Sequence, residues 1–250
     1  MKFNRASKTT LLLLRDVFDL FLINPFSEGK FKNFLRKSMM KKADISFYGL
    51  ANKGDVVIQG GCFMIETVSK WSEIVGPKGK VIIVEASKKN CDILKYEVSR
   101  RYLTNVIIIN KGIWDKKSEM KLDFSDNSHK NKLEIDGIRT KILTDEDYEK
   151  KEVVEVDTIE EILKQAQVDR LDVVCLTVSG AEREALRGMH NILVKDAPRV
   201  WIRCSFYDKQ TNNHTSEDCR DILKKYGYGV AFAKMNKGKV ARNILGCKNK

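Results

Sequence analysis

The sequence has few of the residues that mark several common classes of protein. Of 250 residues, only three are histidine and three are proline, and the six cysteines form no CxxC pair and have no neighbouring histidine. We therefore expect no zinc site and no other metal site. No segment rich in glycine, serine or proline separates domains, and no internal repeat is present. The hydrophobic content of 42% predicts a globular core, which excludes collagen-like, low-complexity and wholly disordered chains.

Long apolar runs are also missing. The longest candidate begins at Leu11 and continues to Ile23, but Arg15, Asp16 and Asp19 interrupt it, and a membrane-spanning helix needs roughly 18 apolar residues. We expect an amphipathic helix that packs on the body, and contact of this helix with a membrane surface is the less favoured alternative. Because no secretory signal precedes the cysteines, we expect a cytoplasmic protein with reduced thiols.

The charge is unevenly distributed. Lys and Arg number 46 against 34 Asp and Glu, which gives a net charge of +12. Residues 1–53 contribute +7 (11 basic, 4 acidic) and residues 234–250 contribute +6 (six basic, none acidic), so residues 54–233 have a net charge of −1. A neutral body with basic ends does not favour nucleic-acid binding, which would depend steeply on salt.

The chain divides at about residue 50. Residues 1–50 predict a lysine-rich helical extension, and residues 51–250 predict one α/β domain. Short runs that are almost continuously apolar predict strands buried on both faces, and helices between them imply right-handed crossovers. The resulting fold is a doubly wound sheet, mostly parallel, with an N-terminal helical cap and a terminal antiparallel hairpin from residues 229–233 and 243–247. The expected strands are 55–59, 81–84, 106–109, 171–178 and 199–204, and the expected helices are 66–75, 90–101, 157 onward, 181–194 and 217–225.

The middle of the chain has a different pattern. Ser118–Phe124 alternates apolar and polar residues, which predicts an edge or antiparallel strand. Residues 125–150 are polar and predict a loop over the sheet, and Val153–Val156 predicts a short strand.

Two segments carry chemistry that can be derived from residue type and position. Gln59-Gly60-Gly61-Cys62 predicts a tight turn after the first strand, where backbone N–H groups can face a ligand; a plain sharp turn is the equal alternative, because the GxGxxG dinucleotide fingerprint is absent. Glu85 ends the second strand, 25 residues after Gly60, where its carboxylate can accept hydrogen bonds from both hydroxyls of a ribose. We expect this carboxylate to face the crevice and to contribute little to folding.

A third segment follows the strand expected at 171–178. Ser179 and Gly180 are the expected N-cap residues of the next helix. Glu182, in the first turn of that helix, is expected to affect a ligand at the crevice far less than Glu85.

From Gly54 to Cys204, the sequence resembles the FkbM-type methyltransferases, which have the class I Rossmann-like fold and use S-adenosyl-L-methionine. The resemblance implies that Glu85 binds the ribose and that residues 110–115 lie beside the adenine. The motifs that carry the resemblance are GDVVI (54–58), GPKGKVI (76–82), VEA (84–86), NV (105–106), NKGIWD (110–115), VDTI (156–159), GAE (180–182) and LRGM (186–189). The implied cofactor-binding residues are Gln59, Gly60, Gly61, Cys62, Glu85, Ala86, Gly112 and Ile113.

The sequence departs from the family pattern at four positions. Gln59 stands where the family usually has Asp, Ile65 where it usually has Gly, and Thr177 and Ser179 where it usually has acidic residues. Either the cofactor is held in a modified way, or the domain is a catalytically degenerate binding or interaction module. The acceptor implied for an active enzyme is a hydroxyl of a small molecule or sugar.

The catalytic residues are unknown from the sequence. Asp126 and His129, in the polar middle segment, are the only candidates for a general base that we name, and a solvated loop position is the simpler interpretation of both.

Overall fold

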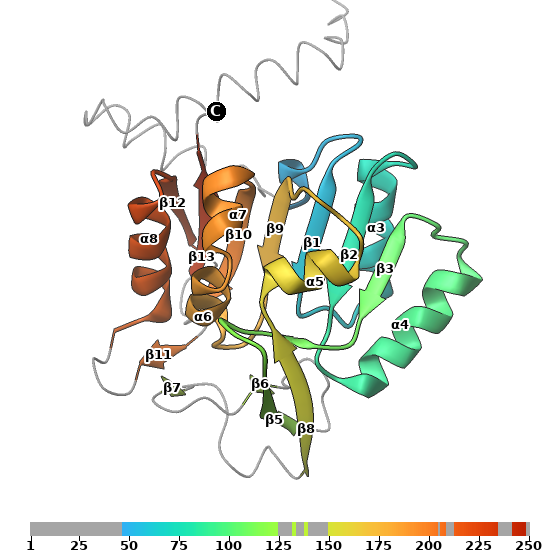
Figure 1. Cartoon of the computed structure of the whole chain (residues 1–250), viewed down its shortest axis with the longest axis horizontal. Coiled ribbons are helices and arrows are strands. Elements are labelled where there is room, and N and C mark those ends of the chain that lie inside the picture. The colour runs from blue at the N-terminus through green and yellow to red at the C-terminus, as the bar shows by residue number, and fades with distance from the viewer. Residues whose placement is uncertain are drawn as a thin grey trace, which may run out of the picture.

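The computed structural model describes residues 47–124, 132–133, 138–139, 150–204, 206–208, 213–234 and 242–248 (Figure 1). The helices expected within residues 1–46 lie outside these residues, and so do the residues that connect the two strands of the expected terminal hairpin. The division at residue 50 therefore stays a prediction.

A seven-stranded sheet forms the centre of the molecule, in the order β12-β13-β10-β9-β1-β2-β3. The five strands from β10 to β3 are parallel, and β13 pairs antiparallel with both β10 and β12. This arrangement confirms the doubly wound α/β fold with a terminal antiparallel hairpin. The strands are β1 (Val56–Gly60), β2 (Lys80–Val84), β3 (Val106–Ile109), β9 (Val173–Leu176), β10 (Arg199–Cys204), β12 (Gly229–Lys234) and β13 (Arg242–Cys247).

The central strands are buried on both faces, as their sequences predict. All five residues of β1 and all four of β9 are buried. Val57 and Val173 face one side, with the cluster around Trp71, whereas Ile58 and Val174 face the other. Ile58 lies in register between Ile82 of β2 and Val174 of β9, so β-branched side chains pack across three neighbouring strands.

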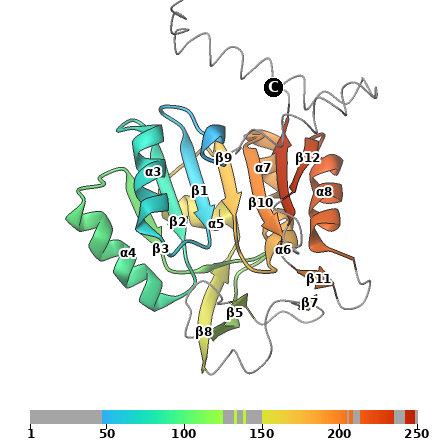
Figure 2. The same ribbon diagram turned by 180° about the vertical axis from the view of Figure 1, so that it is seen from behind.

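Helices cover both faces of this sheet (Figures 1 and 2). The first face packs against a short 3-10 helix, η1 (Phe47–Leu50), and against α3 (Ile65–Val75) and α4 (Lys88–Arg100). The second face packs against α5 (Ile159–Gln165), α6 (Glu182–Arg187), α7 (His190–Lys195) and α8 (Thr215–Lys225).

Side-chain caps fix where two of these helices begin. The hydroxyl of Ser87 accepts the N–H of Asn90 at the start of α4, and the hydroxyl of Thr158 accepts the N–H of Glu161 at the start of α5. Each cap satisfies a backbone N–H that has no partner within the helix. Because α4 follows β2, its cap also sets a loop at the carboxyl edge of the main sheet.

One helix expected from the sequence is in fact two. The sequence predicts continuous helix from Ala181 to Val194, but α6 ends at Arg187 and α7 begins at His190. Gly188 lies at the break, where an added Cβ would come within 2.5 Å of the carbonyl oxygen of Trp114. Close packing against another segment of the chain therefore accompanies the break.

A second, four-stranded sheet has the order β4-β8-β5-β6. The antiparallel pairing of β5 with β8 confirms one expectation, but β5 lies between β8 and β6 and is not an edge strand. The expectation of a loop at 125–150 is wrong for the residues that form short strands there. The other residues of this range lie outside the described part of the chain. The strands are β4 (Gly112–Ile113), β5 (Ser118–Phe124), β6 (Lys132–Leu133) and β8 (Lys150–Asp157), with β7 (Ile138–Arg139) paired to β11 (Tyr207–Asp208).

Candidate functional site

The glycine turn after β1 is closely packed. Gly60 is buried, and a Cβ added there would lie 2.6 Å from the side chain of Ile113. Gly61 has φ of +71°, donates its N–H to the carbonyl of Val84 at 2.8 Å, and has no room for a Cβ beside the carbonyl of Thr177. Position 61 therefore requires glycine for conformation and for space, whereas a Cβ at position 60 would have to displace buried side chains.

Gln59 lies at this turn, but its side chain is directed toward α3. Its carbonyl oxygen accepts the indole N–H of Trp71 at 3.3 Å, and its amide donates to the carbonyl of Gly60 at 3.2 Å. The amide also lies 3.4 Å from the hydroxyl of Thr177, and the whole residue is only 3% exposed. The amide group therefore ties the turn to α3 and to β9 within the core.

Glu85 contacts the same turn from the end of β2. One carboxylate oxygen accepts the N–H of Cys62 at 3.0 Å, and the other accepts the N–H of Ser87 at 2.9 Å and the side-chain amide of Asn90 at 3.3 Å. Burial raises the pKa of this carboxyl, and the three donors oppose the shift. The expectation that Glu85 contributes little to folding is wrong, because the residue is 8% exposed and joins three segments.

The end of β3 is fixed to the end of β2 by the side chain of Asn110, to which the sequence analysis gave no structural role. The amide of Asn110 donates to the carbonyls of Glu85 (3.0 Å) and Ala86 (2.9 Å). Gly112 and Ile113 follow in β4, and the side chain of Ile113 is 2% exposed against Gly60. The structure thus brings all eight residues expected to bind the cofactor to one edge of the sheet, with the side chains of Gln59 and Ile113 packed in the core.

An ion pair connects two further segments near this edge. The ammonium of Lys111 lies 2.9 Å from the carboxylate of Asp157, and the two side chains are 15% and 5% exposed. Asp157 also accepts the N–H of Thr158, which begins α5. The pair therefore joins the segment after β3 to the end of β8. Both residues lie in motifs that carry the family resemblance, but nothing in the sequence indicates that they pair.

The turn after β9 completes the edge. The hydroxyl of Thr177 donates to the carbonyl of Gly60 at 3.0 Å and also contacts that of Gly61. Ser179 and Gly180 have φ of 51° and 110°. The expectation that they cap the next helix is wrong: the cap position is occupied by Ala181, without a side-chain hydrogen bond.

Glu182, the first residue of α6, is hydrogen-bonded to this turn through its carboxyl group. Its two carboxylate oxygens accept the N–H of Gly180, each at 3.1 Å. The residue is 0% exposed, and burial raises its pKa to about 7.

Apolar side chains border the turns. Val178 and Ala181 belong to a cluster with Ala86, Trp114 and residues of β5 and β8, and several members are only partly buried. Phe63 and Met64, which follow the glycine turn, are 38% and 48% exposed. The carboxyl edge therefore combines a glycine turn, a buried acid and an exposed apolar border.

These features fit a nucleoside. A carboxylate can accept about four hydrogen bonds, and Glu85 receives three from the protein, so one acceptor position is left for one ribose hydroxyl, and not for the two expected from the sequence. A cationic group beside β1 and β9 would meet the neutral side chains of Gln59 and Thr177. These residues therefore suit the nucleoside part of the implied cofactor, whereas they offer no opposite charge to its cationic part.

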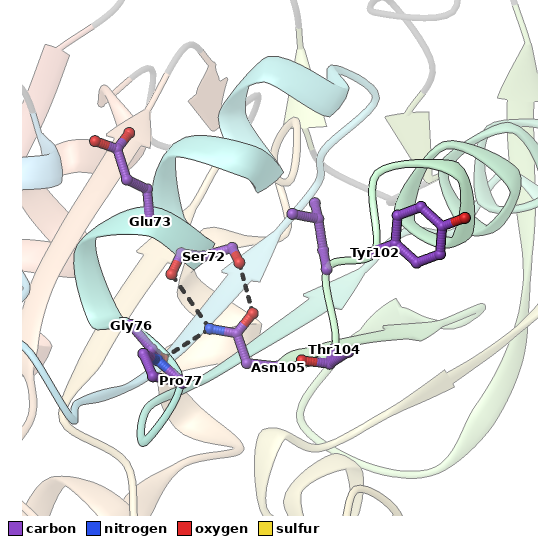
Figure 3. Close-up of a pocket in the computed structure, with 8 residues that line it drawn as sticks. Ser72, Glu73, Gly76, Pro77, Tyr102, Thr104 and Asn105 are labelled. Carbon is purple, nitrogen blue, oxygen red and sulfur yellow. Dashed lines mark hydrogen bonds between the residues drawn. The ribbon is translucent and has the colours of Figure 1, made fainter.

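A shallow groove of about 280 Å³ lies at the opposite edge of the sheet (Figure 3). The amide of Asn105 donates to the carbonyls of Ser72 (3.2 Å) and Gly76 (2.9 Å), and the hydroxyl of Ser72 donates to Asn105 at 2.5 Å. Residues 76 and 105 precede β2 and β3, so this groove is at the amino ends of the strands. Its polar groups bond to one another and connect α3 to β3.

Three other expectations bear on the site. Asp126 and His129 lie outside the described residues. Within the described segments, no group of three or more His, Cys, Asp or Glu side chains is arranged to hold a metal ion. The helices of the same segments are all too short or too polar to span a bilayer.

Comparison with known proteins gives a family match for most of the sequence. The family model of the methyltransferase FkbM domain matches residues 50–230. No curated protein matches the sequence.

Two solved structures are similar in fold. The first is the methyltransferase FkbM from Methylobacillus flagellatus (12% identity, TM-score 0.55), where the match covers 95% of this chain and 60% of that protein. The second is the fibrillarin of Aeropyrum pernix in complex with S-adenosyl-L-methionine (13% identity, TM-score 0.51), with 85% and 74% covered. The chain thus spans about 60% of the length of the first protein.

Proposed function

Because the chain belongs to the FkbM methyltransferase domain family, we propose that it transfers the methyl group of S-adenosyl-L-methionine to a hydroxyl of a small molecule or sugar. The observation that carries the proposal is the contact between Glu85 and the glycine turn: the carboxylate accepts the N–H of Cys62 at 3.0 Å and keeps an acceptor position for a ribose. The residues proposed to hold the cofactor are Gln59, Gly60, Gly61, Cys62, Glu85, Ala86, Gly112 and Ile113.

The chemistry asks little of the protein beyond binding and alignment. The bound sulfonium supplies an electrophilic methyl group. Glu85 fixes the ribose, and the apolar side chains of Phe63, Met64, Ala86 and Val178 offer a surface for the rest of the nucleoside. Holding the acceptor hydroxyl in line with the methyl group then supplies most of the rate enhancement.

Calorimetric titration with S-adenosyl-L-methionine tests the proposal. We expect the parent protein to bind, and Glu85→Ala to bind roughly 10- to 150-fold more weakly, because a hydrogen bond to a charged group contributes about 1.5–3 kcal/mol. Glu85→Gln should lose less affinity, since its amide oxygen still accepts a hydrogen bond. Equal affinity in Glu85→Ala and the parent protein would contradict the ribose assignment.

The same variants need a stability control, because Glu85 also receives three hydrogen bonds from the protein. Urea unfolding should show Glu85→Ala to be less stable by about 2 kcal/mol, since buried donors lose their acceptor. Affinities are therefore compared at a temperature where both variants remain folded. Transfer of a radiolabelled methyl group to a panel of sugars and hydroxylated small molecules then tests the acceptor class, with RNA and protein as the competing acceptors.

A catalytically degenerate binding module is the second candidate. It is favoured by the neutral side chains at the ends of β1 and β9: Gln59 bonds to Trp71, and Thr177 bonds to the glycine turn. This candidate predicts neither heat nor a thermal shift with S-adenosyl-L-methionine, whereas the enzyme requires both.

A further inference from the structure

The turn between β9 and α6 contacts a buried carboxyl group that the proposed function does not use. Glu182 is 0% exposed, and both of its oxygens accept the N–H of Gly180 at 3.1 Å. Ser179 and Gly180, just before it, both have positive φ, at 51° and 110°. Serine rarely adopts this conformation, so another interaction must stabilise it here.

The same turn forms part of the border of the proposed nucleoside site. Val178 lies close to the backbone of Gly60, 3.1 Å from where a Cβ would stand, and packs in one cluster with Ala86 and Trp114. Thr177 donates its hydroxyl to the carbonyl of Gly60. A change in the conformation of residues 177–181 would therefore displace the border of the site and the glycine turn.

Several ionisable groups face Glu182 from the elements packed around it. On α6, the charge of Glu184 raises the pKa of Glu182 and that of Arg183 lowers it, but burial is the largest influence and raises the value to about 7. Arg183 forms ion pairs with Glu184 (3.4 Å) and Asp218 of α8 (3.2 Å). The hydrogen bond with Cys219 and burial raise the pKa of the Cys204 thiol on β10, and burial raises that of the Cys219 thiol on α8. The charge of Glu182 is a smaller influence that raises both.

We propose that the ionised carboxylate of Glu182 is a positioning residue that holds Ser179 and Gly180 in their left-handed conformations and so shapes the border of the nucleoside site. A hydrogen bond to a charged acceptor is stronger than one to a neutral acceptor, so ionisation holds the turn more firmly. An apolar side chain would be easier to bury than this carboxylate, which is consistent with a functional reason for the charge. The ligand in this inference rests on the proposed function, but the state of the turn does not.

The turn can be observed without any ligand. Ser179–Gly180 is the only Ser-Gly step in the sequence, so labelling with carbonyl-¹³C serine and ¹⁵N glycine identifies the Gly180 amide by NMR. We expect its proton resonance to move downfield as the pH rises from 5.5 to 8.5, with a midpoint near 7, and to stay constant in Glu182→Gln. A Gly180 resonance that does not titrate in the parent protein would overturn the inference, whatever the protein binds.

Ligand affinity gives the second measurement, with S-adenosylhomocysteine as the probe. We expect the parent protein to bind about 5- to 10-fold more tightly at pH 8 than at pH 6, and Glu182→Gln to bind equally weakly at both. Glu184→Gln is the matched control: Glu184 is also a buried carboxylate of α6, but it pairs with Arg183 and Arg187 and should leave the pH dependence unchanged. If Glu182→Gln fails to fold, Glu182→Met takes its place in this comparison.

The outcomes separate the two proposals. Absence of binding by the parent protein contradicts the proposed function, and the Gly180 titration still decides the role of Glu182. Binding by the parent protein with the same affinity and pH dependence in Glu182→Gln contradicts the role of Glu182. An equal loss of pH dependence in Glu184→Gln also contradicts it, because the effect would then belong to the charge of α6 as a whole.

Discussion

Gly54 and Gly61 show how two glycines that both have positive φ can differ in the substitutions they tolerate. Both have positive φ, at 85° and 71°. Nothing lies within 4 Å of a Cβ added at Gly54, whereas a Cβ at Gly61 would overlap the carbonyl of Thr177. A substitution at Gly54 therefore tests conformation alone, and one at Gly61 tests conformation together with contact.

We expect Gly54→Ala to lower the free energy of unfolding by about 1 kcal/mol, the cost of a left-handed alanine. Gly61→Ala should cost about 2 kcal/mol more, because the clash is with backbone and the β9 turn must move. Urea unfolding of both variants measures the difference. Similar losses in the two variants would mean that the glycine turn is not held against β9.

At the scale of secondary structure, η1 lies close to the expected domain boundary and packs on the main sheet. The ring of Phe47 lies 4.8 Å from that of Trp201, and the ring of Tyr48 lies 4.9 Å from that of Trp71. Leu50 is 8% exposed in the same cluster. These contacts pack η1 against the core of the described domain, with Leu50 buried in it.

Two truncations test this placement. Removal of residues 1–50 should lower the free energy of unfolding by about 2–4 kcal/mol relative to removal of residues 1–46, because the apolar contacts of three side chains are lost. Tryptophan fluorescence should also shift to longer wavelength only in the shorter protein, as Trp71 and Trp201 become exposed. Equal stability of the two truncated proteins would support the predicted division at residue 50.

The strands were predictable because their signal is local. Runs such as Val81–Val84 and Val106–Ile109 are β-branched and continuously apolar. Their bounds agree with those of β2 and β3 to within one residue. The break at Gly188 was not predictable, since one glycine in a helical pattern is tolerated and the contact with Trp114 is distant in sequence.

The candidate site shows the same division between local and long-range information. The positions of the glycine turn and of Glu85 at strand ends follow from pattern and spacing. The burial of Glu85 depends on Asn90 and on the backbone of Cys62, and the direction of the Gln59 side chain depends on Trp71. The sequence alone therefore predicts which strand ends meet at the candidate site, and not the partners of its side chains.

For the whole molecule, the buried carboxyls predict an unusual dependence of stability on pH. Burial raises the pKa of Glu182 to about 7, above the ordinary value of 4.5. Between these two values the folded state binds a proton that the unfolded state has released, so stability must fall as the pH rises. A shift of this size corresponds to about 3 kcal/mol, which is present below pH 4.5 and lost once the pH exceeds 7.

Urea unfolding at pH 4.5 and pH 8 measures this effect. Relative to Glu182→Gln, the parent protein should lose about 3 kcal/mol between the two pH values. Taking the difference between the proteins removes the contribution of their other titrating groups. Parallel pH profiles of the two proteins would show that Glu182 has an ordinary pKa in the folded state.

The position of β13 constrains the order in which the sheet can be completed during synthesis. β13 lies between β10 and β12, although it follows both in the chain. Until residues 242–247 have left the ribosome, β12 has no strand to join, and the edge of β10 remains unpaired. The nascent chain therefore carries an open edge of the kind that pairs with other chains, and closure of this half of the sheet waits for its last strand.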